Sequence, residues 1–327
     1  MKKILSLFFF LLFAFSSAFA QEISPALTVE DITAPSPFSH YPSRNEEGYL
    51  PLDQGDKEFV FVDEEEGRWI YLSATMQVEI LRYKGVHKKK PIIWYEADIK
   101  TNLPFFQVFC ASSDTPHKKL LRPEDIALKH QVVYAQNGDF FTYRLKRDKK
   151  PGIIIRNNTV LCQKTNKKAG ISLPPLDELS LYCDGHFELH TPGTLSADDY
   201  LSKGAHDVLS FGPILINDGV IDTRLSENRL YTNREPRSAI GMVSPGHYMG
   251  FYIEARNKRS YGCGLPFIAQ RMVDQGCQLA INLDGGQTAA MMFMGKPVMK
   301  GADYNGYTHT RPQQDIIGIG TSPLVKE

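Results

Sequence analysis

A bend near the end of the chain carries residue types that chemistry needs. Asn282-Leu283-Asp284-Gly285-Gly286-Gln287-Thr288 places a carboxylate after an alternating apolar segment and follows it with two glycines. Glycine lets a backbone approach a ligand closely, and loops held by rigid elements often carry function. We therefore interpret this bend as a candidate site. A tight turn that merely ends a strand is the alternative.

Two earlier segments add a second carboxylate and a guanidinium. Gln136-Asn137-Gly138-Asp139 lies between an apolar run and the aromatic pair Phe140-Phe141, and a simple hairpin turn is the alternative interpretation. Arg237 enters an apolar segment directly after Pro236. A guanidinium in that position indicates an anion nearby, unless it belongs to a solvent-facing edge strand.

Common catalytic motifs are missing from the sequence. It contains no Gly-x-Ser-x-Gly elbow, no P-loop, no HExxH motif and no Gly-x-Gly-x-x-Gly before a helix. Neither a CxxC motif nor a Cys/His cluster at zinc spacing occurs, and the nine histidines are scattered. The sequence therefore names no metal ligands.

A helix and a strand must position the late bend. Apolar residues at 265, 268, 269, 272 and 273 predict an amphipathic helix that Gly276 ends. Alternation over 277–283 predicts a strand that delivers Asn282 and Asp284 to the glycines. Tight Asp-Gly turns at 184–185 and 218–219 predict hairpins. The pattern indicates an α+β fold, with an antiparallel-rich mixed sheet and a few packed helices.

The first twenty residues have the pattern of a secretory signal peptide. Lys2 and Lys3 precede an apolar run, and an A-x-A site ends at Ala20. The run is shorter than a membrane span needs, and no later segment is long and apolar enough to span. We expect an exported protein, periplasmic or extracellular. Its predicted parts are a signal peptide (1–20), an N-terminal arm or linker (21–67) and one domain (68–327).

The composition limits the classes of partner that we expect the protein to bind. Lys and Arg number 37 and Asp and Glu 37, so no basic excess points to nucleic acid. Five cysteines leave at least one thiol unpaired within a monomer, and Cys263 and Cys277 are candidates for a disulfide across the predicted helix. The sequence does not settle the pairing of Cys110, Cys162, Cys183, Cys263 and Cys277, nor the oligomeric state.

Taken together and in order, these segments resemble the phosphodiester glycosidase family, which includes the lysosomal uncovering enzyme and exported bacterial relatives. The resemblance covers roughly residues 90–320. It rests on the motifs at Asn137–Phe141, Ser210–Leu215, Pro236–Gly241, Asn282–Thr288 and Arg311-Pro312. Three positions depart from the family pattern. Gln287 and Thr288 stand where the family has glycine and serine, and Ser238 replaces the usual threonine. Gln287 adds bulk where the family lets a ligand approach.

The resemblance implies a glycosidase that cleaves a sugar-1-phosphodiester, with N-acetylglucosamine as one candidate sugar, in envelope or exopolysaccharide processing. Its substrate partner would be a glycan phosphodiester or polysaccharide. The catalytic candidates are Asp284, Arg237 and Asp139. The substrate-binding candidates are Asn137, Gly138, Asn282, Gly285, Gly286, Gln287, Thr288 and Arg311.

Two other hypotheses stay open. The same residues could bind an envelope glycan or glycan phosphate without cleaving it. Alternatively, Asp139 and Asp284 could hold a metal in a phosphodiesterase that breaks the P–O bond. No cofactor is certain, and a structural Ca²⁺ ion is compatible with every hypothesis.

Overall fold

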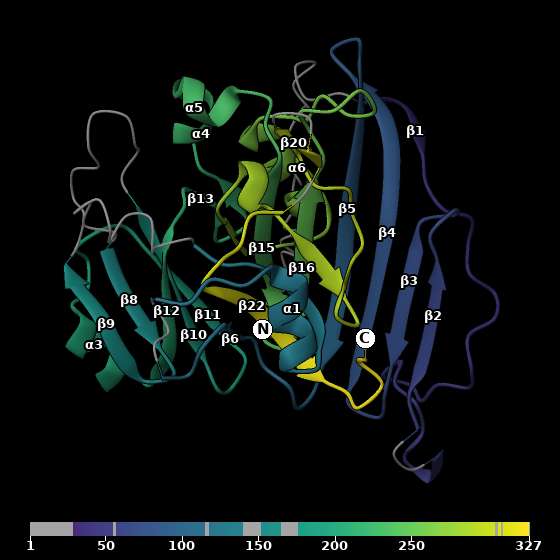
Figure 1. Cartoon of the computed structure of the whole chain (residues 1–327), viewed down its shortest axis with the longest axis horizontal. Coiled ribbons are helices and arrows are strands. Elements are labelled where there is room, and N and C mark those ends of the chain that lie inside the picture. The colour runs from purple at the N-terminus through teal and green to yellow at the C-terminus, as the bar shows by residue number, and fades with distance from the viewer. Residues whose placement is uncertain are drawn as a thin grey trace, which may run out of the picture.

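A large antiparallel sheet forms the centre of the protein (Figure 1). The computed structural model describes residues 29–54, 57–114, 118–139, 152–164, 176–304, 307–308 and 310–326. The expected signal peptide over residues 1–20 lies outside these. In order across the central sheet the strands are β14 (Val220–Ile221), β13 (Ile214–Asn217), β17 (Leu279–Asn282), β15 (Arg237–Ser244), β16 (His247–Ile253), β5 (Lys90–Thr101), β4 (Met76–His87), β3 (Arg68–Leu72) and β2 (Phe59–Asp63), with β1 (Glu30–Thr33) paired to β4.

Two five-stranded sheets complete the framework. The β7 sheet has the order β19 (Lys296–Pro297), β18 (Met291–Phe293), β7 (Val132–Asn137), β22 (Asp315–Thr321) and β6 (Gln107–Cys110). The β12 sheet has the order β11 (Phe187–His190), β10 (Asp177–Tyr182), β12 (Ala205–Phe211), β8 (Gly152–Arg156) and β9 (Thr159–Lys164). A short ribbon pairs β20 (Asp303–Tyr304) with β21 (Tyr307–Thr308).

The helices are short and few in the described part of the chain. They are α1 (Pro123–Lys129), α3 (Ala197–Ser202), α4 (Arg224–Glu227), α5 (Arg229–Thr232) and α6 (Leu265–Asp274), with 3₁₀ turns η2 (Leu52–Gln54) and η3 (Gly286–Thr288). Every strand pair between described residues is antiparallel. The predicted α+β class with an antiparallel-rich sheet is therefore confirmed.

The predicted helix and strand before the late bend are both present. α6 begins at Leu265 and ends at Asp274, and Gly276 follows it with a φ of 86°. That left-handed conformation favours glycine, which explains why the helix stops there. β17 then runs to Asn282 and ends directly at the bend.

Strand alternation places apolar side chains on both faces of the central sheet. On β5, Tyr95 packs into a core shared with the β7 sheet, whereas the neighbouring Trp94 packs on the other face with residues of α6. The rings of Trp94 and Phe267 meet edge-on with centroids 5.8 Å apart. Full burial of such side chains contributes about 1.5–3 kcal/mol each. The central sheet is thus held from both sides, and the strand ends that carry the site are fixed.

The N-terminal part differs from the expected arm over residues 21–67. Within its described residues, β1 pairs with β4 and β2 pairs with β3, at the edge of the central sheet seen in Figure 1. The alternation of Phe59–Asp63 is that of a strand, and the acidic run after it forms the turn into β3. Of the helices described, none is both long and apolar enough to cross a membrane.

The suggested pairing of Cys263 with Cys277 is wrong. These residues lie beyond opposite ends of α6, whose ten residues span about 15 Å. A disulfide requires Cα atoms within about 7 Å. All five cysteines are free.

Candidate active site

One cavity collects most of the predicted site residues. It has a volume of about 340 Å³ and lies where β15 begins and β17 ends. Polar and charged side chains form one part of its wall, and apolar ones form another. The polar group comprises Asn233, Glu235, Arg237, Arg256, Asn282, Asp284, Gln287 and Arg311, and the apolar group comprises Leu176, Phe211, Pro213, Leu230 and Tyr231. We call this cavity the arginine pocket.

Antiparallel pairing explains why Arg237 and Asp284 meet. Ala239 of β15 lies opposite Asn282 of β17, so the start of one strand and the end of the other share an edge of the sheet. The pairing continues into the bend, because Gly286 N–H donates to the Pro236 carbonyl at 2.9 Å. The two motifs, separated in sequence, are thus one structural unit.

The two glycines of the bend are required by this close approach. A Cβ on Gly285 would lie 2.9 Å from the Pro236 carbonyl oxygen, closer than real Cβ atoms come. Gly286 has a φ of 65°, a conformation that other residues seldom adopt. The glycines therefore let the bend dock against β15 and hold Asp284 at the pocket wall.

Asp284 is half-buried and positioned from several sides. Its Oδ1 accepts the Gly285 N–H at 2.9 Å. The side chain of Asn137 donates to the Asp284 backbone carbonyl at 2.8 Å and to the Gly138 carbonyl at 3.0 Å. Asn137 Oδ1 in turn accepts the Ala290 N–H at 3.0 Å. Asn137 is fully buried and does not line the pocket, so it acts as a clamp that fixes the catalytic candidate.

Arg237 lines the pocket with part of its hydrogen-bonding capacity unused. Its Nη2 donates to the Leu230 carbonyl at 2.6 Å, whereas its buried Nε has no partner among the described residues. Burial lowers the pKa of Arg237 below its ordinary value, and the positive charge of Arg256 acts in the same direction. Two like charges held close together are stabilised by an anion between them.

An ion pair in this wall could not be predicted from the sequence. Nε and Nη2 of Arg256 both donate to Glu235 Oε2 at 2.7 Å. Arg256 has a φ of 58° and follows β16, and a Cβ on Gly286 would lie 3.7 Å from its Nη1. Glu235 stands within the motif around Arg237, but the 21 residues to Arg256 hide the pairing from any local pattern. Arg311, which was predicted, is the third arginine of the pocket.

Asp139, an expected catalytic residue, lies elsewhere. It is fully buried and lines none of the pockets described here. Its Oδ1 accepts Nη2 of Arg156 at 3.0 Å, and its Oδ2 accepts the Ser210 N–H at 3.0 Å. Arg156 also donates to Asp315 at 2.8 Å. The carboxylate is therefore used in internal contacts outside the arginine pocket, an arrangement that favours a structural role over the expected catalytic one.

The remaining predicted binding residues divide into two groups. Asn282 and Gln287 line the pocket with the bend glycines, and the buried Asn282 Oδ1 has no partner among described residues. Thr288 is fully buried and does not line it. Gly138 also lies outside the pocket, and a Cβ there would collide with the Asp315 carboxylate. Phe140 and Phe141, the aromatic end of that motif, lie outside the described residues.

The part of the chain that the structure describes contains no candidate metal site. No group of three or more His, Cys, Asp or Glu side chains lies close enough there to hold an ion. Asp139 and Asp284, proposed above as shared ligands, are in different surroundings. The pairing expected for a metal-dependent phosphodiesterase is therefore not formed by these two residues.

A comparison with protein-family models matches the part of the chain that carries the arginine pocket. A family model described as phosphodiester glycosidase matches residues 130–320. The matched range contains all the charged residues of the arginine pocket. Among curated proteins, the SPbeta prophage-derived uncharacterized protein YomE of Bacillus subtilis is 30% identical over 114 residues. The match covers 35% of this chain and 18% of YomE, so the chain spans less than a fifth of that relative's length.

Solved structures share the fold. The catalytic domain of zebrafish N-acetylglucosamine-1-phosphodiester alpha-N-acetylglucosaminidase, auto-inhibited by its pro-peptide, aligns with a TM-score of 0.59 at 17% identity, over 88% of this chain and 97% of that one. A protein of Synechocystis aligns at 0.50 and 12% identity, over 76% and 62% of the two chains. A candidate exported protein of Burkholderia pseudomallei aligns at 0.50 and 11%, over 72% and 75%.

Proposed function

The chain belongs to the phosphodiester glycosidase family, and we propose that it hydrolyses a sugar-1-phosphodiester between the anomeric carbon and the bridging oxygen. One observation carries the proposal: the Asp284 carboxylate and three arginines line the same cavity. Such a cavity suits a ligand in which a phosphate group is bonded to a carbon atom that develops positive charge during the reaction. The anomeric centre of a sugar phosphodiester is such a group.

The arginines would hold the phosphodiester. A guanidinium fork matches phosphate oxygens in two parallel hydrogen bonds. Arg237 has an unused Nε, whereas Arg256 is oriented by Glu235. The leaving group is a phosphate monoester whose second pKa is about 6, so it departs without a strong general acid. Fixed positive charge can therefore do what a proton donor does in ordinary glycosidases.

Asp284 would stabilise the sugar side of the transition state. Glycoside cleavage passes through an oxocarbenium-like state, which a neighbouring carboxylate stabilises. The Gly285 N–H on Oδ1 and the Asn137 clamp on its backbone fix this carboxylate before substrate binds. A fixed group loses little free energy to reorganisation during the reaction.

The apolar wall would receive the sugar ring. Phe211, Pro213 and Tyr231 face the same cavity as the arginines. The buried Asn282 Oδ1 would accept a hydrogen bond from a sugar hydroxyl or amide. We propose N-acetylglucosamine as the sugar, since the zebrafish enzyme of similar fold is named for it.

We further propose that the protein acts outside the cytoplasm on envelope or exopolysaccharide glycans. The signal-like pattern of residues 1–20 supports export. Similarity in fold to a candidate exported protein agrees with it. The expected partner is a glycan phosphodiester, and no contact with nucleic acid is implied.

The test is product analysis of UDP-N-acetylglucosamine hydrolysis in oxygen-18 water. Label in the freed sugar and none in the phosphate, read by mass spectrometry and phosphorus NMR, would support C–O cleavage. Asp284→Asn and Arg237→Ala should each lower kcat/KM by about 10²–10³-fold. The matched controls Asp98→Asn and Arg122→Ala, at exposed sites outside the pocket, should react like the wild type.

Other results would redirect the proposal. Label in the phosphate would mean P–O cleavage and a phosphodiesterase. Binding without turnover across a panel of sugar-1-phosphodiesters would mean a glycan-phosphate binder. Full activity in both Asp284→Asn and Arg237→Ala would place the reaction in another part of the molecule.

A further inference from the structure

A second pocket lies beside the start of β12 and shares no lining residue with the arginine pocket. It has a volume of about 640 Å³, within the range of ligand sites. We call it the His206 pocket and define it by Phe105, Gln107, Phe109, Asn157, Asn158 and His206. The proposed glycosidase reaction uses none of these residues.

The wall of the His206 pocket is built by a clamped turn. Asn157 and Asn158 join β8 to β9 with φ values of 46° and 59°. The Asn158 N–H donates to the His206 carbonyl, and the Asn157 N–H donates to Asp207 Oδ1, both at 2.8 Å. The side chains of both asparagines belong to exposed residues that line the pocket. The clamp uses the backbone N–H groups of the two asparagines and not their side-chain amides.

His206 has an unpartnered ring nitrogen in this wall. Its Nδ1 lies 2.8 Å from Asp207 Oδ2, and that oxygen also accepts the Val108 N–H at 2.9 Å. Because a carboxylate only accepts, Nδ1 carries a proton, and in this tautomer Nε2 is an acceptor. His206 is 6% exposed, and its Nε2 is buried without a partner among the described residues. A buried acceptor left unpaired is unfavourable, and a ligand hydroxyl would relieve that cost.

The charges of the pocket favour a neutral ligand. Asp114, Arg156 and Asp207 are its acidic and basic lining residues besides two histidines. Arg156 is engaged by Asp139 and Asp315, and Asp207 by the groups just described. Among the lining residues that the structure describes, no excess of positive charge remains to hold a phosphate. Burial raises the pKa of Cys110 to about 12, so this thiol in the wall is not a nucleophile at neutral pH.

Aromatic rings supply the apolar part of the wall. Phe105 is half-buried, and its ring centroid lies 5.2 Å from that of His206. The ring centroids of Phe109 and His130 lie 5.4 Å apart. Aromatic faces beside planar amides and a hydrogen-bond acceptor are the surroundings that a sugar ring prefers, because its C–H face is apolar and its hydroxyls are donors.

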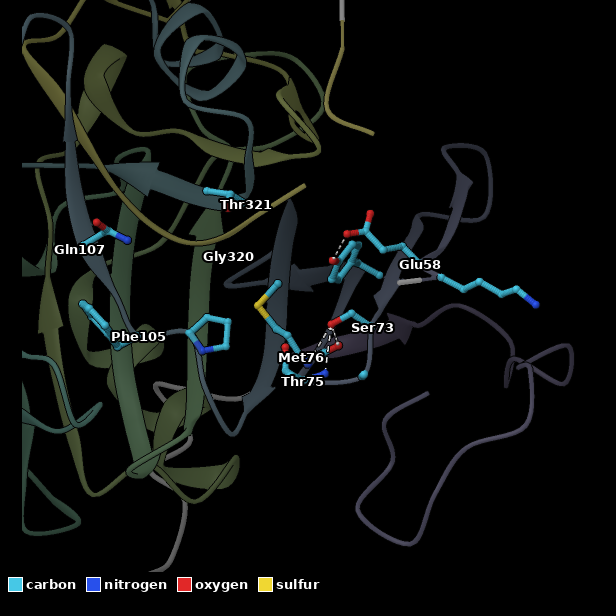
Figure 2. A pocket seen from close by; sticks show the side chains of 12 residues that line it. Glu58, Ser73, Thr75, Met76, Phe105, Gln107, Gly320 and Thr321 are labelled. Carbon is cyan, nitrogen blue, oxygen red and sulfur yellow. Dashed lines mark hydrogen bonds between the residues drawn. The ribbon is translucent and has the colours of Figure 1, made fainter. Parts of the chain in front are cut away.

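A neighbouring hollow extends this site. Figure 2 shows it, with Phe105 and Gln107 along one side and Ser73, Thr75 and Met76 along the other. Its volume is about 370 Å³, and Phe105 and Gln107 line both hollows. The two spaces therefore border each other across these side chains. A second sugar-binding hollow could therefore lie on the far side of Phe105 and Gln107.

We propose that the His206 pocket is a binding site for a neutral, hydroxyl-rich ligand, a segment of a glycan chain. A ligand hydroxyl donates to Nε2 of His206, and a ring packs against Phe105. This site would hold a polysaccharide independently of the phosphate held by the arginines. The inference does not rest on the proposed reaction, because the two pockets have different residues.

The test is equilibrium binding of the full chain to an array of neutral mono- to tetrasaccharides, with sugar phosphates as a second array. Retention of at least one neutral oligosaccharide is expected, followed by calorimetry on the best ligand. His206→Ala should weaken binding of that ligand about tenfold, the loss of one hydrogen bond worth about 1.4 kcal/mol. Phe105→Ala, at a half-exposed position, tests the same site should the histidine variant fail to fold.

Arg237→Ala separates the two pockets. It should leave neutral-glycan binding unchanged while it weakens binding to the sugar-phosphate array. The proposal would be overturned if no neutral glycan is retained, or if wild type and Phe105→Ala bind equally. Equal loss of neutral-glycan binding in Arg237→Ala would also overturn it, since the ligand would then occupy the arginine pocket.

Discussion

Glu178 should make the protein less stable as the pH rises from acid to neutral. This residue lies on β10 and is fully buried, and the Tyr200 hydroxyl donates to its Oε2 at 2.8 Å. Burial raises the pKa of Glu178 from 4.5 to about 7. Glu178→Gln removes the charge and keeps both the shape and a carbonyl acceptor for Tyr200.

The size of the effect follows from the two pKa values. Between about pH 4.5 and pH 7 the folded protein holds a proton on Glu178 that the unfolded chain has lost. The free energy of unfolding therefore falls with rising pH in that window. A difference of 2.5 pKa units, 7 minus 4.5, at about 1.4 kcal/mol each, gives a loss of about 3 kcal/mol that is complete above pH 7. Glu178→Gln should not show this loss.

Urea unfolding at pH 5 and pH 8 measures the effect. Burial also raises the pKa of Asp315 to about 6, so wild type and variant share that second contribution. The difference between them isolates Glu178: the variant should exceed the wild type by about 3 kcal/mol at pH 8 and by much less at pH 5. Equal pH dependence in the two proteins would show that Glu178 is ionised in the folded state, and would refute the reasoning.

Four further substitutions test the site. Asp284→Asn should lower kcat about 10²–10³-fold and leave Tm unchanged. Asp139→Asn should keep the kcat of the wild type and lower the free energy of unfolding by about 1–3 kcal/mol. If kinetics and calorimetry gave the reverse result, Asp139 would belong to the active site. Gly138→Ala should destabilise by about 1–3 kcal/mol, because its methyl group collides with the Asp315 carboxylate; an unchanged urea midpoint would contradict that contact. Arg256→Ala should raise KM about tenfold with a smaller change in kcat, whereas a loss confined to kcat would mean that it acts only in the transition state.

The arginine pocket could be predicted from the sequence because local residue patterns indicate the elements that form it. Alternation along 277–283 fixes the end of β17, and the apolar residues after Arg237 fix the start of β15. Two glycines mark the bend between them. Such signals lie within a few residues of the atoms they position. The same locality explains why the hairpins and α6 were predictable.

The misjudged residues depend on partners far along the chain. Asp139 turns inward to Arg156, which ends the apolar strand Gly152–Arg156. The argument applied to Arg237, that an arginine in an apolar strand needs an anion, applies equally to Arg156. For Arg156 that anion is internal. The pairing of Glu235 with Arg256 and the orphaned nitrogen of His206 likewise arise from packing, which no spacing in the sequence records.

The position of Arg156 has a consequence for how the protein unfolds. This arginine stands on β8 of the β12 sheet, whereas its partner Asp315 belongs to β22 of the β7 sheet and its partner Asp139 follows β7 by two residues. If one sheet opened alone, charges would remain buried without their counter-ions, a cost of about 3–5 kcal/mol. Partial opening along this boundary is thus penalised relative to complete unfolding. We therefore expect the two sheets to open together, and with them the wall of the His206 pocket, which takes residues from both.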